Sequence, residues 1–161
     1  VQYGLQVANS DWPFFSSPMP VLSRGESPGQ TGGLPVPVSG KVIRGFGMVI
    51  DPIDNMERFH PGVDIEAPVG SAVSAVMGGK VVRVGESPAL GNFVLVERAP
   101  GSYTLYGQLA RSTVAESQAV QAGQMLGEVG TRGDIAGSGL HFEMRENNKL
   151  IDPLARLKIN Q

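Results

Sequence analysis

The chain has two histidines in 161 residues, and each lies in a segment that suits metal binding. His60 is followed by Pro61-Gly62 and then by Asp64, so a turn at Pro-Gly would bring an imidazole and a carboxylate together. His141, on a distant strand, would complete a three-ligand site with an open fourth position, as in a catalytic zinc site. Other divalent metals also accept these ligands. The spacing alone does not exclude two unrelated histidines, one in a turn and one on a strand, because HxxxD is common by chance.

The composition indicates one β-rich globular domain. A chain of 161 residues, 41% of them hydrophobic, is long enough to bury a core. Only 17% of the residues are charged, while 22 glycines and 12 prolines favour short strands and turns. The net charge of −2 gives no basic surface, so no nucleic-acid partner is expected. The absence of cysteine excludes disulfides, zinc–thiolate sites and thiol catalysis.

From residue 38 onward the pattern predicts an antiparallel β domain with little helix. Apolar and polar residues alternate over short runs that glycines interrupt. Strands are expected in VSGKVIRGFGMVID, in SAVSAVMGGKVVRVGE (two strands around Gly78-Gly79), and in FVLVER, SYTLYGQLA, MLGEVG and residues 140–145. A glycine-rich loop is expected over residues 132–139 and a hairpin turn over residues 146–149.

Residues 1–37 have a different composition and predict an arm or linker before a domain over residues 38–161. Pro, Gly and Ser recur every few residues, which disfavours regular structure. The aromatic cluster DWPFF at residues 11–15 is expected to pack onto the domain, with binding to a partner as the alternative. No apolar run reaches the ~20 residues that span a bilayer. Because the chain begins with Val, we expect a fragment whose leader or membrane anchor lies outside it.

Seven blocks of the chain, taken in order, carry a family resemblance: PVSGKVIRGFG, FHPGVDIEAPVGSAVSAVMGGKVV, GNFVLVE, YTLYGQL, GQMLGEVG, GLHFEMR and IDPLARL. Together they resemble the LytM-type domain of the M23 (lysostaphin-like) metallopeptidase family over roughly three-quarters of the chain. The resemblance implies an all-β antiparallel domain of the duplicated hybrid-motif kind. It also implies a groove with a zinc ion on its floor, and cleavage of peptides in the bacterial cell wall.

The resemblance assigns metal ligation to His60, Asp64 and His141 but does not carry over the catalytic residues. The family has a His-x-His pair whose first member lies beside the metal-bound water, and Gly139 stands at that position here. A second catalytic histidine normally follows Tyr-Gly, where this chain has Gln108. A glutamine does not exchange protons near neutral pH, and glycine has no side chain. The loss of a general base typically costs ~10²–10⁴-fold in rate.

Four further residues are candidates for the groove: Tyr106, Gln108, Arg132 and Glu143. Tyr106 on a strand fits the core as well as the groove. Arg132, in the glycine-rich loop, would contact a ligand or pair with Asp134. Glu143 is one candidate for a substitute base. Two residues after His141 on one strand, it faces the same side of the sheet at ~6.6 Å, and a structural role behind the metal site is preferred.

These observations predict a catalytically degenerate domain that acts as a binding or regulatory module of the cell envelope. Its zinc would be structural, and its partner would be an envelope protein or peptidoglycan. Degenerate members of the family serve as activators of cell-wall amidases in division or as components of sporulation membrane complexes. An extracytoplasmic location with a membrane tether is expected.

Two alternatives stay open. One is an active zinc-dependent peptidoglycan endopeptidase in which Gln108 supplies the oxyanion contact. The other is a transport-type β domain of the phosphotransferase kind, against which the HPGVD spacing argues.

Overall fold

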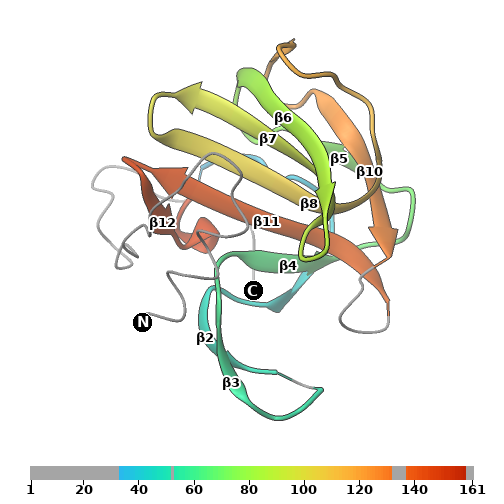
Figure 1. The fold of residues 1–161 in the computed structure, drawn as a ribbon, viewed down its shortest axis with the longest axis vertical. Helices are drawn as coiled ribbons and strands as arrows, with labels where there is room; N and C mark the ends of the chain where they lie inside the picture. Colours follow the sequence, from blue (N-terminus) through green and yellow to red (C-terminus); the bar gives the residue numbers. More distant parts are fainter. Residues whose placement is uncertain (1–32, 52, 132–136, 159–161) are drawn as a thin grey trace.

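The computed structural model describes residues 33–51, 53–131 and 137–158 (Figure 1). Twelve strands lie in the described residues: β1 (Lys41–Arg44), β2 (Gly47–Ile50), β3 (Glu57–His60), β4 (Val63–Glu66), β5 (Ala72–Ser74), β6 (Gly79–Ser87), β7 (Gly91–Ala99), β8 (Ser102–Ser112), β9 (Ala119–Val120), β10 (Met125–Thr131), β11 (Ser138–Glu146) and β12 (Lys149–Ile151). One short 3-10 helix, η1 (Pro153–Ala155), follows them. No helix in this part of the chain is long and apolar enough to cross a membrane.

Ten of these strands form one antiparallel sheet, which confirms the predicted all-β class. Its order is β1-β4-β11-β10-β8-β7-β6-β9, with β12 added to β11 and β5 to β10. Strand β11 is the central element because it pairs with β4, β8, β10 and β12. Of the three strands that carry the ligand candidates, β4 and β11 pair with each other, and β3 leads directly into β4.

The two strands predicted around Gly78-Gly79 form, but they do not pair with each other. Strand β5 pairs with β10, while β6 pairs with β7 and β9. A Cβ at Gly79 would meet the carbonyl of Glu97 on β7, so the sheet approaches too closely there for a side chain.

Strands β2 and β3 form a separate two-stranded ribbon that projects from the main sheet (Figure 1). The chain enters this ribbon from β1 and leaves it into β4, so it extends the β1–β4 pair beyond the sheet. Phe46 and Phe59 pack edge to face near its base, with ring centroids 5.5 Å apart. The ribbon is therefore anchored to the rest of the domain at the end that contains His60.

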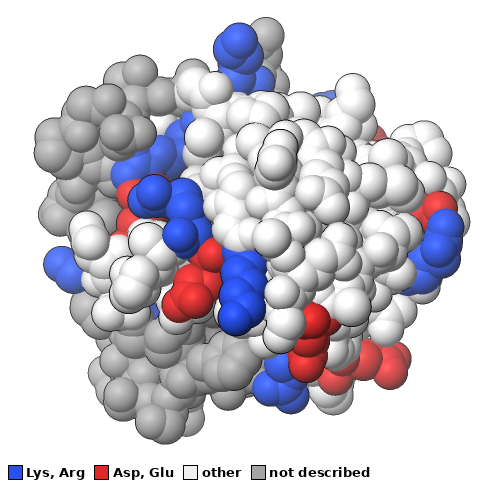
Figure 2. All heavy atoms as spheres, turned by 90° about the horizontal axis from the view of Figure 1, so that it is seen from above, with Lys and Arg blue, Asp and Glu red and all other residues white. Residues whose placement is uncertain are grey.

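The main core lies on one face of the sheet and contains buried side chains from nearly all of its strands, among them Ile65, Val94, Leu126 and Phe142. A smaller cluster lies on the other face and is formed by Leu90, Phe93, Leu95 and Leu105. Strands β7 and β8 are thus covered on both faces and cannot shift register without exposing apolar groups. Figure 2 shows a broad area with few charged side chains on the face it displays.

Residues 33–37, the last residues of the predicted arm, are hydrogen-bonded to the domain. The amides of Gly33 and Leu34 donate to the carbonyl of Arg156, and Leu34 forms a parallel bridge with Leu157. The carbonyl of Pro37 accepts from the amide of Ser74. The aromatic cluster at residues 11–15 lies outside the described residues.

Candidate functional site

Three different strands bring His60, Asp64 and His141 together, as the sequence predicts for a metal site. His60 ends β3, Asp64 lies in β4, and His141 lies directly opposite Asp64 in the β4–β11 register. Only a glycine fits in the turn between the first two, because a Cβ at Gly62 would collide with the carbonyl oxygen of Phe142 on β11. The Pro-Gly turn therefore lies against β11 and holds both ligands at the sheet.

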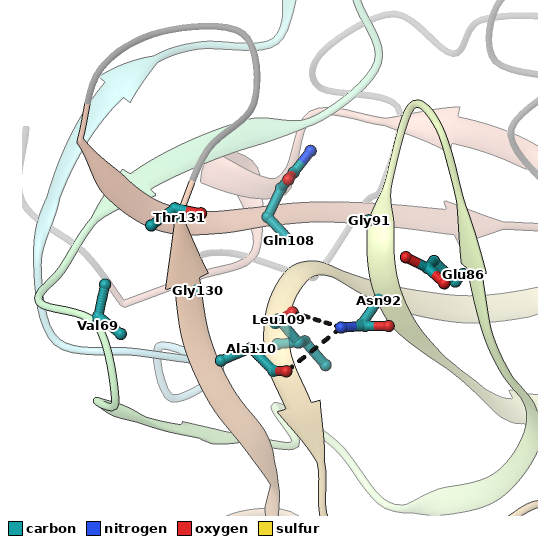
Figure 3. Close-up of a pocket in the computed structure, with 9 residues that line it drawn as sticks. All are labelled: Val69, Glu86, Gly91, Asn92, Gln108, Leu109, Ala110, Gly130 and Thr131. Atoms are coloured by element: carbon teal, nitrogen blue, oxygen red, sulfur yellow. Dashed lines mark hydrogen bonds between the residues drawn. The ribbon is translucent and has the colours of Figure 1, made fainter.

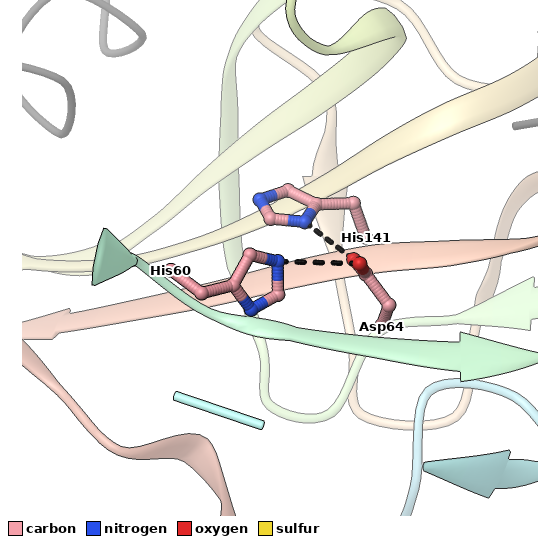
Figure 4. Close-up of side chains that lie close together, drawn as sticks. All are labelled: His60, Asp64 and His141. Carbon is pink, nitrogen blue, oxygen red and sulfur yellow. Dashed lines mark hydrogen bonds and ion pairs between the residues drawn. The ribbon is translucent and has the colours of Figure 1, made fainter. Parts of the chain in front are cut away.

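The three side chains point toward one another (Figure 4). His141 Nδ1 lies 2.7 Å from Asp64 Oδ1, and His60 Nε2 lies 3.2 Å from Asp64 Oδ2. One ligand atom from each residue lies within 4.8 Å of the others, and all three residues are buried. Zinc bonds of ~2.0–2.2 Å in tetrahedral geometry separate ligand atoms by roughly 3.3 Å. The cluster is therefore close to the size that zinc requires.

Each histidine is oriented by a second hydrogen bond on its outer nitrogen. His60 Nδ1 donates to the carbonyl of Gly45 at 2.9 Å, and His141 Nε2 donates to Glu143 Oε2 at 2.6 Å. A carbonyl accepts only, so Nδ1 of His60 carries the hydrogen. In neutral His60 the lone pair of Nε2 then faces a carboxylate oxygen, an arrangement that needs a cation or proton between them. Outer partners of this kind fix the ring orientation of metal-binding histidines.

The charges of the site suit a cation in the same place. Burial raises the pKa of the Asp64 carboxyl, but hydrogen bonds from His141 and His60 outweigh it and hold that pKa well below its usual range. Burial lowers the pKa of His141, yet the bonds to Asp64 and Glu143 raise it to about 10. These shifts favour a proton shared between His141 and Asp64, which a metal ion bound there would displace.

Arg44 on β1 adds a positive charge at the edge of the cluster. Its guanidinium lies 3.6 Å from Asp64 Oδ2, and its side chain is mostly buried. Sequence reasoning did not identify Arg44 or the carbonyl of Gly45, because neither has a motif signal. Only the pairing of β1 with β4 brings them to the site.

The two positions where the family has catalytic histidines offer no proton-transfer group. Gly139 pairs with Glu66 on one side and Gly130 on the other. Gln108 has a left-handed backbone, with φ of 64°. Its amide donates to the carbonyl of Leu90 at 2.6 Å, and its Nε2 donates to the carbonyl of Ala89 at 3.0 Å. The Gln108 side chain is thereby tied to the β6–β7 connection.

The predicted groove residues that the structure describes lie in different environments. Tyr106 does not line a groove: it is fully buried in the core, packs on Phe142 and accepts a hydrogen bond from the amide of Val76. Burial raises its pKa to about 12. Glu143 also has no exposed surface and supports His141 instead.

Among the predicted groove residues in the described part of the chain, Gln108 lines a pocket, together with residues that sequence reasoning missed (Figure 3). Arg132 lies outside the described residues.

Comparison with known proteins agrees with this geometry. The model of peptidase family M23 matches residues 58–153, the segment that contains all three ligand candidates. The chain is 36% identical over 110 residues (68% of this chain) to the DD-carboxypeptidase/endopeptidase Mpg of Neisseria meningitidis. It is 32% identical over 122 residues (75% of this chain) to the murein hydrolase activator NlpD of Salmonella dublin. The matches span only 25% and 30% of those two proteins.

A solved structure has the same fold. A zinc-containing peptidase from Vibrio cholerae superimposes with a TM-score of 0.67 and 27% identity, over 79% of this chain and 41% of that chain. The family match covers more than half of the chain. The chain belongs to peptidase family M23.

Proposed function

We propose that this domain is a catalytically degenerate M23 domain that binds zinc and acts as a binding or regulatory module in the cell envelope. One observation carries the proposal: the ligand set converges, while the proton-transfer positions hold Gln108 and Gly139. Both histidines of the chain are used as ligands, so no third imidazole is available as a base.

The zinc assignment rests on the donor set. His60, Asp64 and His141 would hold the ion, and Gly45 and Glu143 would orient the two imidazoles. When bound, zinc supplies Lewis acidity toward a carbonyl. Peptide hydrolysis also needs a positioned base and a donor for the oxyanion. Glu143 is buried and bonded to His141, so it does not reach a substrate. The ion would therefore stabilise the junction of β3, β4 and β11 without rapid turnover.

An exposed apolar surface beside the site supports a role in binding. Four large hydrophobic side chains on the β2–β3 ribbon and its connecting loop are more than half exposed: Met48, Ile50, Ile53 and Met56. Contiguous exposed apolar groups mark contact surfaces more often than isolated ones do. The charges of the loop are paired internally, because Arg58 binds Asp51 at 3.1 Å and Asp54 at 2.6 Å. The ribbon is thus available to an envelope protein or to peptidoglycan.

The proposed setting is extracytoplasmic, in cell division or sporulation. The resemblance to a murein hydrolase activator supports an activator role.

The experiment is hydrolysis of purified peptidoglycan sacculi with added zinc. The wild type is compared with His60→Ala and with the double variant Gln108→His/Gly139→His. We expect a silent wild type and cleavage by the double variant. Histidine is among the residues that tolerate the left-handed backbone at position 108. Binding of the wild type to sacculi is measured in the same samples by co-sedimentation.

The second candidate is an active zinc endopeptidase. Retention of the complete ligand set and the 36% identity to an endopeptidase favour it. Cleavage by the wild type that His60→Ala abolishes would establish this candidate and overturn the degenerate one.

A further inference from the structure

We propose that the pocket lined by Gln108 is a binding site for a primary ammonium group carried by a peptide. The pocket has a volume of about 340 Å³ and is lined by Val69, Glu86, Gly91, Asn92, Gln108, Leu109, Ala110, Gly130 and Thr131. The inference deepens the proposed binding function and rests on it, because it names the chemical group that this part of the domain would recognise.

The side chains of the pocket offer more acceptors than free donors. Asn92 Nδ2 donates to the carbonyls of Leu109 and Ala110 at 3.0 and 3.3 Å, so both of its N–H groups are used (Figure 3). Gln108 Nε2 donates to the carbonyl of Ala89. The amide oxygens of Asn92 and Gln108 have no donor among the described residues. An ammonium group supplies three donors and no acceptor, which is the complement of this lining.

Glu86 gives the pocket a negative charge. It lies opposite Asn92 in the β6–β7 register, and in Figure 3 the amide oxygen of Asn92 points away from the two carbonyls, to the side on which Glu86 is drawn. No cationic side chain among the described residues forms an ion pair with Glu86, whereas the neighbouring Glu116 has Arg83 within 3.9 Å. Pocket carboxylates without a cation favour a positively charged ligand.

The pocket wall is held in one conformation, which is what a recognition site needs. Gln108 and Gly91 both have left-handed backbones, with φ of 64° and 62°. A Cβ at Gly91 would lie 3.2 Å from Gln108 Oε1, so the two residues are packed together. With its backbone amide and its side chain both bonded to the β6–β7 connection, Gln108 presents its oxygen in a fixed position.

The test uses the side-chain amides of Asn92 and Gln108 as reporters in NMR titrations. The probe is Nα-acetyl-lysine amide, and the matched control ligand is the same compound acetylated on Nε, which removes the charge and two donors. We expect the first compound to shift both amide pairs and the second to shift neither. Because Glu86 is exposed, Glu86→Gln should weaken binding about threefold, and Glu97→Gln near the other end of β7 should leave it unchanged.

Equal shifts with both compounds would overturn the proposal, and so would the absence of a shift with either. Arg132 follows the pocket residue Thr131 in the sequence, so Arg132→Ala is titrated as well. If discrimination between the two compounds requires that substitution, the cation of the pocket belongs to the chain itself and the proposal is wrong. Binding of the wild type to sacculi distinguishes failure of this inference from failure of the proposed function. If the protein binds sacculi but not the lysine compound, only the assignment of the pocket is wrong.

Discussion

Replacement of Glu143 by glutamine tests whether this buried carboxylate secures the metal site. Glu143 is fully buried, and its Oε2 accepts from His141 Nε2 at 2.6 Å, a length typical of a charge-assisted bond. Glutamine keeps the shape and one acceptor oxygen but removes the charge that makes the imidazole a stronger ligand. Loss of such outer partners typically lowers metal affinity by ~10–100-fold. That factor corresponds to about 1.4–2.7 kcal/mol.

The assay is zinc competition against a chromophoric chelator, with thermal unfolding in excess chelator to establish that the variant folds. Glu97→Gln is the matched control, because Glu97 accepts from Tyr103 Oη at 3.1 Å in a strand pair that contains no ligand candidate. We expect the control to bind zinc as the wild type does. A folded Glu143→Gln variant whose zinc affinity stays within twofold of the wild type would refute the role of Glu143 in orienting His141.

Three further predictions concern proton release, the pH dependence of stability, and the turn. Because the pKa of His141 is raised to about 10, zinc binding at pH 7.5 should release about one proton. Calorimetry in buffers of different ionisation enthalpy measures this release. Proton release near zero would contradict the proton shared by His141 and Asp64. In the metal-free protein the same raised pKa stabilises the fold fully below pH 6.5, and this contribution is lost as the pH rises through about 10, which urea titrations in chelator can follow. Gly62→Ala should destabilise the protein by about 2–4 kcal/mol and weaken zinc binding, because its Cβ would collide with the carbonyl of Phe142. Gly45→Ala, whose Cβ would meet nothing within 4 Å, is the control, and equal stability of the two variants would contradict the steric argument.

The sequence alone determined the fold class and the composition of the candidate metal site. Alternation broken by glycine is a local property, so it identifies strands such as β7 and β11 without knowledge of their neighbours. The chain has two histidines, and the HPGVD spacing with a second distant histidine leaves few ways to assemble three ligands. The family resemblance likewise implies, without coordinates, that Gln108 and Gly139 stand where proton-transfer groups are expected.

Tertiary structure decided which face each residue occupies. On β8, Leu105 and Tyr106 are both fully buried, because core clusters cover both faces of the central strands. Alternation therefore does not distinguish a core tyrosine from a groove tyrosine there. The pairing of β5 with β10 instead of β6 is a contact between distant segments, and no local pattern encodes it.

The environment of each site residue also depends on contacts that are distant in sequence. His60 owes its orientation to the carbonyl of Gly45, a backbone atom that any residue type would supply. Gln108 acquires its left-handed backbone and its bond to Ala89 only where β8 meets the β6–β7 connection. The sequence thus determined which chemical groups are present, and the packing of β1, β4, β8 and β11 decided which of them meet, because strand pairing is set by contacts across the whole chain.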